Sequence, residues 1–170
     1  PLSGPGGFTK SGSGELLITA TGNFSGDSQI NGGTLNLQGS LDGGGSLEIT
    51  STATFTGNGT YSGPVAVSGT VAPGITTGTL NTGPISFGPS STLQLQINGS
   101  SPGQFDSLNA VGAVTLDGTL AVSLAPGYLP VAGDTFQILT ATSISGNFSK
   151  LTGVQYDNGA LLPIITPTGL

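Results

Sequence analysis

The side chains that carry most enzyme chemistry are few in this sequence and lie far apart. The chain has no His and no Cys, which excludes Ser-His-Asp and Cys-His catalysis as well as imidazole and thiolate metal ligands. Glycoside hydrolysis needs two carboxyl groups that flank one substrate bond. In the C-terminal half the acids nearest to each other are Asp106 and Asp117. We therefore predict no catalytic residue, no metal or cofactor, and a protein that is not an enzyme.

Four threonines form the most suggestive surface. Thr50, Thr52, Thr54 and Thr56 occupy alternate positions, so they would line one face of a single strand. A flat array of hydroxyls can order water or bind sugars. Threonine is also common on the outer face of strands because its branched side chain suits the extended backbone and pairs with neighbouring threonines. Both interpretations of this polar face stay open at this stage.

An apolar segment near the C-terminus is the second candidate. Leu161, Leu162, Ile164 and Ile165 surround Pro163 in a strand-like stretch. Such a segment can add to the sheet edge of another copy and drive self-assembly, although Pro163 limits the pairing. The alternative is that the segment folds back over its own chain.

Charge restricts the partners. Only Lys10 and Lys150 are cationic, against eight acids and a net charge of −6. Nucleic acid and anionic membrane surfaces are disfavoured, because both require clustered Lys and Arg. No apolar run is long enough to span a bilayer. Charged residues make up only 6% of the chain, and a surface of uncharged polar residues favours an extracellular location.

The hydrophobic pattern predicts the elements that would position these residues. Apolar side chains alternate with polar ones, as at Leu93, Leu95 and Ile97, and Gly, Asn or Pro ends each run. This alternation is typical of strands joined by turns. Related phrases recur at irregular spacing, including Gly33-Thr-Leu, Gly45-Ser-Leu, Gly78-Thr-Leu and Gly118-Thr-Leu. Loose repetition favours an all-β chain folded as a parallel β-helix, with inward aliphatic ladders and about two strands and two turns per coil.

Two regions of this helix differ in their sequence pattern. Residues 1–102 carry the repeated phrases and are predicted to form β-helix coils. In residues 103–170 the turns lengthen, and Pro126 and Pro130 interrupt regular pairing. We predict that residues 103–170 continue the helix and then cap its end, because open strand edges promote aggregation.

Several phrases in order resemble a known bacterial repeat. The stretch from Gly6 to Thr19, followed by Ile30-Asn-Gly-Gly-Thr-Leu-Asn-Leu, is similar to the passenger-associated transport repeat of bacterial autotransporters. The later phrases Ser91-Thr-Leu-Gln-Leu-Gln-Ile and Gly133-Asp-Thr-Phe-Gln-Ile-Leu-Thr-Ala resemble the C-terminal end of those passengers. The similarity covers nearly all of residues 6–153. The sequence departs from the family pattern at its C-terminus, where the membrane-spanning barrel of that family would follow.

The resemblance implies a right-handed parallel β-helix at the bacterial cell surface, whose C-terminal part assists folding during secretion. We expect a non-enzymatic structural or adhesive protein that mediates attachment or self-assembly into fibres, with itself or cell-surface glycans and proteins as partners. A carbohydrate- or ice-binding module is the first alternative and predicts one flat, regular polar face. A polysaccharide lyase or glycosidase is the second and predicts a groove with converging carboxylates.

Overall fold

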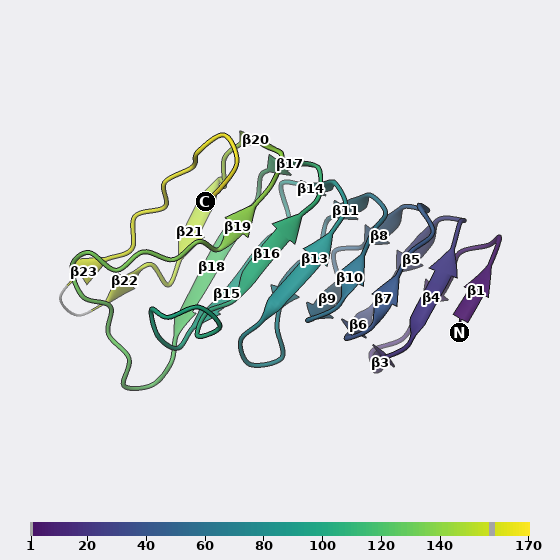
Figure 1. Cartoon of the computed structure of the whole chain (residues 1–170), viewed down its shortest axis with the longest axis horizontal. Helices are drawn as coiled ribbons and strands as arrows, with labels where there is room; N and C mark the ends of the chain where they lie inside the picture. The colour runs from purple at the N-terminus through teal and green to yellow at the C-terminus, as the bar shows by residue number, and fades with distance from the viewer. Residues whose placement is uncertain (1, 157–158) are drawn as a thin grey trace.

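The computed structural model describes residues 2–156 and 159–170, and every regular element in them is a β-strand. Three sheets of seven parallel strands each run along the long axis of the molecule. The N-terminus lies at one end of this stack, and the C-terminal segment lies at the other (Figure 1). The prediction of an all-β parallel β-helix is confirmed.

Each sheet contains one strand from each successive coil of the β-helix. Sheet A contains β1 (Leu2–Gly4), β4 (Thr21–Phe24), β7 (Ser40–Leu41), β10 (Thr60–Tyr61), β13 (Thr79–Thr82), β16 (Ser107–Ala110) and β19 (Leu139–Thr140). Sheet B contains β2 (Thr9–Lys10), β5 (Ser28–Ile30), β8 (Leu47–Ile49), β11 (Val65–Val67), β14 (Ile85–Phe87), β17 (Ala113–Leu116) and β20 (Ser143–Gly146). Sheet C contains β3 (Glu15–Ile18), β6 (Gly33–Leu37), β9 (Ala53–Gly57), β12 (Thr70–Pro73), β15 (Thr92–Ile97), β18 (Thr119–Leu124) and β21 (Lys150–Thr152).

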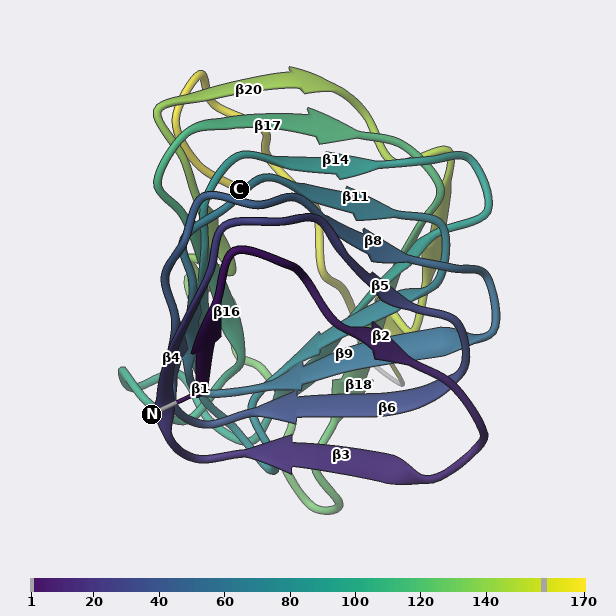
Figure 2. The same cartoon turned by 90° about the vertical axis from the view of Figure 1, so that its right-hand side faces the viewer.

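Viewed along the axis, the three sheets enclose a single interior (Figure 2). Each coil therefore has three strands and three turns, and the expectation of two strands per coil is wrong. The third strand of each coil, which the sequence pattern did not predict, belongs to sheet A. Its members β7 and β10 are only two residues long and bury one side chain each, Leu41 and Tyr61. A strand with one inward residue leaves no alternation in the sequence to detect.

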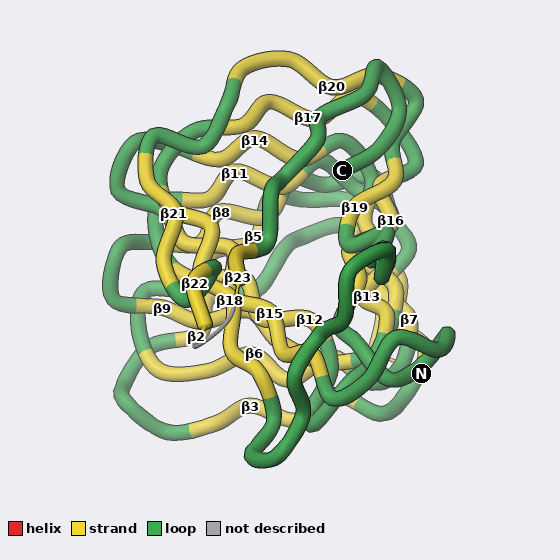
Figure 3. Tube along the Cα trace, turned by 90° about the vertical axis from the view of Figure 1, so that its left-hand side faces the viewer, coloured by secondary structure: helices red, strands yellow, loops and turns green. Residues whose placement is uncertain are grey.

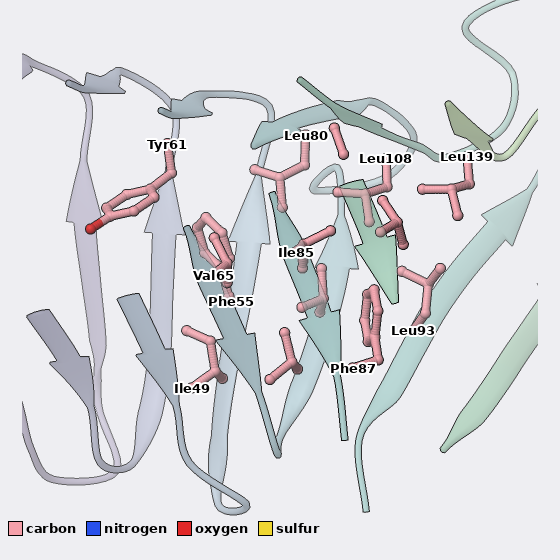
Figure 4. Packing of buried hydrophobic residues seen from close by; sticks show 14 of the residues in the cluster. Ile49, Phe55, Tyr61, Val65, Leu80, Ile85, Phe87, Leu93, Leu108 and Leu139 are labelled. Carbon is pink, nitrogen blue, oxygen red and sulfur yellow. The ribbon is translucent and has the colours of Figure 1, made fainter. Parts of the chain in front are cut away.

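The interior is built from in-register columns of apolar side chains. In sheet A, Leu80 pairs with Leu108, which pairs with Leu139, and all three are fully buried. Figure 4 shows these leucines facing side chains from the other two sheets, among them Phe55 and Phe87. Because each side chain rests on the equivalent residue of the next coil, the core is continuous along the stack.

The coils keep their register although their lengths differ. From Leu16 the chain needs 19 residues to reach Leu35, its partner in sheet C, but from Leu120 it needs 31 to reach Leu151. The additional residues lie in the turns. The loose period predicted from the sequence is thus a property of the turns and not of the strands.

Glycine permits close approach at the entrances of sheet C. Gly33 is the first residue of β6, and Gly118 precedes β18. Their φ angles of +66° and +73° lie in a region that residues with a Cβ rarely adopt. A Cβ at Gly33 would lie 2.3 Å from the carbonyl oxygen of Gly14, and one at Gly118 would lie 2.4 Å from that of Ser91.

The C-terminal segment closes one end of the stack. The sheets run without a break across residue 102 as far as β21, so residues 103–152 extend the same helix. Beyond it, β22 (Gln155–Tyr156) pairs antiparallel with β23 (Gly159–Ala160). The chain then crosses the end of the stack (Figure 3). Leu170 exchanges two backbone hydrogen bonds with Leu139 and is 8% exposed.

We predict that Leu95→Ala lowers the free energy of unfolding by about 2–5 kcal/mol, because truncation leaves a cavity in a packed column. Leu95 is fully buried and pairs with Val122. Urea denaturation measures the change. Gln94→Ala is the control, since Gln94 is exposed on the opposite face of β15 and its truncation should cost less than about 0.5 kcal/mol. Equal losses for both variants would contradict the assigned register.

Candidate functional site

The structure separates the four threonines that were predicted to share one strand face. Strand β9 begins at Ala53, and Thr50 and Thr52 lie in the turn before it. Their hydroxyls donate to the carbonyl oxygens of Ile30 and Asn31 of the preceding coil, both at 3.0 Å. The single-strand expectation is therefore wrong for Thr50 and Thr52. Their hydroxyls instead form hydrogen bonds with backbone carbonyl groups. Such side-chain bonds compete with regular strand pairing.

The other two threonines do lie on the outer face of β9, with different surroundings. Thr56 donates its hydroxyl proton to the carbonyl oxygen of Gly74 at 2.7 Å. Thr54 makes no side-chain hydrogen bond within the described part of the chain. Of the four predicted residues, Thr54 is thus the one whose hydroxyl remains available to a ligand.

Thr54 belongs to a row that runs across the strands of sheet C. In-register pairing places Thr34, Thr54 and Thr70 beside one another, and the row continues through β15 and β18. We call this set the threonine row: Thr34, Thr54, Thr70, Thr92 and Thr119. Neighbouring strands are about 4.8 Å apart, so the row presents a hydroxyl at each such step along the axis.

The row is open to solvent and chemically uniform. Each member is half-buried between its neighbours, and no hydroxyl of the row bonds to another group among the described residues. None of them is enclosed either, since the buried unpaired oxygens of the described chain are Asn36 Oδ1 and Thr82 Oγ1. The row ends in register with Glu15 at one side and Lys150 at the other.

The polar column on sheet A differs from the row. There Asn109 donates to Asn81 Oδ1 at 3.0 Å, and Thr140 donates to Asn109 Oδ1 at 2.6 Å. These side chains satisfy one another, as polar columns in parallel sheets commonly do. The contrast identifies the threonine row, whose hydroxyls are unengaged, as the better candidate for contact with an external molecule.

Sequence reasoning missed the row because its members lie 16 to 27 residues apart. One local pattern could have found it. A small residue, a threonine and a large apolar residue occur together at Gly33-Thr-Leu, Ala53-Thr-Phe, Gly69-Thr-Val, Ser91-Thr-Leu and Gly118-Thr-Leu. The same pattern at Gly78-Thr-Leu lies in sheet A, so the pattern alone does not define the row.

The two acids weighed for catalysis occupy different turns and different environments. Asp106 is 1% exposed and accepts hydrogen bonds from the backbone N–H groups of Gly78 at 2.9 Å and Gln96 at 2.8 Å. Asp117, between β17 and β18, accepts from the Gly118 N–H at 2.7 Å and the Ser149 hydroxyl at 2.5 Å. Both carboxylates stabilise turns. The described residues contain no group of three acids positioned to hold a metal ion.

The apolar C-terminal segment folds back over its own chain, which is the alternative that the sequence left open. Leu161 is half-buried and packs against the core. Leu162 and Ile164 are 81% and 73% exposed, and Ile165 is 36% exposed. None of the four lies in a strand. Beside them is an open, largely apolar cavity of about 390 Å³ lined in part by Leu120, Val131, Phe136, Leu162 and Ile164.

Comparison with protein-family models found no matching family, and a search of curated proteins found no significant match. No helix of membrane-spanning length is present in the described ranges. Since neither comparison found a match, the resemblance to autotransporter passengers rests only on the sequence phrases between Gly6 and Ala141.

Burial of Asp106 predicts a pH dependence of stability. Desolvation raises the pKa of its carboxyl from 3.8 to about 6, although the two N–H donors oppose the shift. The folded state therefore binds the proton more tightly than the unfolded state. The stabilisation from Asp106 is complete below pH 3.8 and is lost as the pH rises through about 6. We expect thermal unfolding scans to show stability falling across this window.

Asp106→Asn removes this titration and should flatten the slope. It should also lower stability at each pH, because the NH2 group replaces one of the two oxygens that accept an N–H. Asp27, Asp42 and Asp117 do not interfere, since hydrogen bonds lower the pKa of each carboxyl. Their contributions are lost only as the pH falls below 3.8. An unchanged slope in Asp106→Asn would rule out Asp106 as the source.

Proposed function

We propose that this protein is a non-catalytic, extracellular β-helix of a bacterial surface protein, similar to an autotransporter passenger, that acts in attachment or self-assembly. The observation that carries the proposal is the pair of surfaces on each sheet. The inner face is mostly apolar along the stack, and the outer face carries aligned, mostly uncharged side chains. Such a rod presents long repetitive sides to a partner.

Bonds between successive coils support a rigid rod. Asp27 accepts hydrogen bonds from both the N–H and the hydroxyl of Ser46, at 2.9 and 2.7 Å. Asp117 accepts from Ser149, a residue of the following coil. These contacts fix turns that are otherwise irregular in length. A rod with fixed turns keeps its side-chain columns aligned, which a surface for repeated weak contacts requires.

The charge distribution suits neutral partners. With 6% charged residues, sheet faces can approach an uncharged polymer or another copy with little desolvation of ions. The two rival functions differ in what they require. A lyase or glycosidase needs free paired carboxylates, whereas Asp106 and Asp117 are both engaged in turns. A binding module needs a regular polar face, and the threonine row is one.

Attachment is tested with particles coated with the chain and applied to bacterial cells and to arrayed cell-surface glycans. We expect retention above that of particles coated with an unrelated acidic protein. Release of reducing or unsaturated sugar is measured in parallel on the same polysaccharides. Product release at a steady rate would show an enzyme and would refute the non-catalytic assignment.

Self-assembly is tested through the exposed C-terminal side chains. We predict that Leu162→Ser with Ile164→Ser shifts sedimentation and light scattering of concentrated protein toward the monomer, because the change removes exposed apolar area. Val111→Ser is the matched control, since Val111 is 72% exposed in the turn between β16 and β17. Truncation is unsuitable, because Leu170 completes the core at Leu139. A wild-type chain that stays monomeric at high concentration would remove assembly from the proposal.

A further inference from the structure

The threonine row is a regular line of hydroxyls on the proposed attachment surface, and its chemistry indicates the kind of molecule that the row contacts. We propose that the row binds an extended, uncharged, hydroxyl-rich polymer, that is, a neutral polysaccharide chain lying across the strands of sheet C. This inference rests on the proposed function in attachment and names its partner class.

The hydroxyls of the row match such a ligand in chemistry and in direction. A threonine hydroxyl both donates and accepts, as does each hydroxyl of a sugar. Thr34, Thr54 and Thr70 form no hydrogen bonds through their hydroxyls with other described side chains, so a ligand would displace only water. Five hydroxyls on consecutive strands span about 19 Å at the usual strand separation. That length suits several units of an extended chain.

A second observation points to a hydroxyl donor at the same place. Asn36 follows the row member Thr34 by two residues on the outer face of β6, in register with Leu17 and Thr56. It is only 7% exposed, and its Oδ1 has no hydrogen-bond partner, while its Nδ2 donates to Glu15 at 3.4 Å. An unpaired buried amide oxygen is costly. Because this oxygen is itself enclosed, the Asn36 side chain must turn outward before a hydroxyl of a chain bound on the row can supply the missing donor.

The distribution of charge favours a neutral polymer. Within the row there is no ionised group, and Glu15 and Lys150 stand only at its two ends. The one other cation, Lys10, is 7% exposed, and its ammonium donates to the carbonyl oxygens of Gly12 and Gly32, each at 2.8 Å. A uniformly anionic polysaccharide would therefore meet a single exposed cation along its length.

The column beside the row favours a linear ligand over an ice surface. Its residues are mixed, and include Leu17, Asn36, Thr56 and Ala72. A crystal face requires regular spacing in two directions, whereas this face is regular only along the axis. The outer face of sheet C also has no aromatic residue among its described strands. Ring stacking is therefore absent, and affinity must arise from many weak contacts, so it should rise steeply with ligand length.

The test replaces hydroxyls without changing shape. Thr54→Val, Thr70→Val and Thr92→Val are combined in one variant, which retains branched side chains suited to strands. The matched control combines Thr21→Val, Thr60→Val and Thr115→Val, which lie on the outer faces of sheets A and B. Circular dichroism confirms that both variants fold. Asn36→Val is a separate variant that leaves the row intact.

Binding is measured by depletion of each protein on immobilised cellulose, xylan, mannan and amylose, with anionic alginate alongside. We expect the wild-type chain and the control to bind at least one neutral polymer. The row variant should bind at least about tenfold more weakly, because it loses three hydrogen-bonding groups. Asn36→Val should also weaken binding, and soluble oligosaccharides should compete better as they lengthen.

Several results would overturn the inference. These are equal binding by the row variant and the wild type, wild-type binding to alginate alone, or no wild-type binding to any polymer. Inhibition of ice recrystallisation that disappears in the row variant would assign the row to ice instead. If coated particles still adhere to cells when the row variant is used, the proposed attachment function stands and the row is not its cause. If wild-type particles also fail to adhere and the protein stays monomeric, the proposed function itself is wrong.

Discussion

Parallel hydrogen bonding between successive coils is the interaction on which the whole molecule depends. Each strand lies about 4.8 Å from the next, so every residue of a strand is held beside one residue of the preceding coil and one of the following coil. Side chains are consequently arranged in columns along the axis. Columns that face inward must be apolar, as at Leu80, Leu108 and Leu139, because buried polar groups need partners. Columns that face outward carry no such requirement.

Polar groups at the turns and ends are satisfied by the backbone more often than by opposite charges. Lys10 occupies the inward position of β2, in register with Ile30, yet its ammonium reaches turn carbonyl oxygens. Asp106 is buried with two N–H donors, one just before β13 and one within β15. A chain with so few charges cannot pair its buried ions with one another. Backbone dipoles stabilise them instead, and the pKa of Asp106 is raised because desolvation outweighs its two N–H donors.

The sequence predicts the strands far better than it predicts their arrangement. Alternation located the inward residues of sheet C, and the spacings from Leu16 to Leu35 and from Leu47 to Val65 are true coil repeats. Neighbouring strands with one inward residue, such as β7 and β10, leave no periodic trace. The phrase Gly-Thr-Leu occurs in sheet C at Gly33 and in sheet A at Gly78. A recurring short phrase therefore predicts the start of a strand but not the sheet to which the strand belongs.

The candidate surface shows the same limit. Alternation within one segment suggested Thr50, Thr52, Thr54 and Thr56, whereas the row of the structure takes one threonine from each of five coils. Register across coils depends on turn lengths, and a turn can absorb extra residues without any local sign of the alignment that results. Only Thr54 is common to both sets. Whether the apolar segment around Leu162 added to another chain or folded back depended likewise on long-range packing at Leu170.

The variable turns make sheet surface and turn sequence separable. Between equivalent positions of sheet C, the chain from Val71 to Leu93 takes 22 residues and from Leu93 to Leu120 takes 27, yet both pairs of strands stay in register. Inserted residues in the turn between β15 and β16 would lengthen a loop without shifting a column. New recognition sequences can therefore be introduced at these corners, by evolution or by design, while the rod that presents them keeps its geometry.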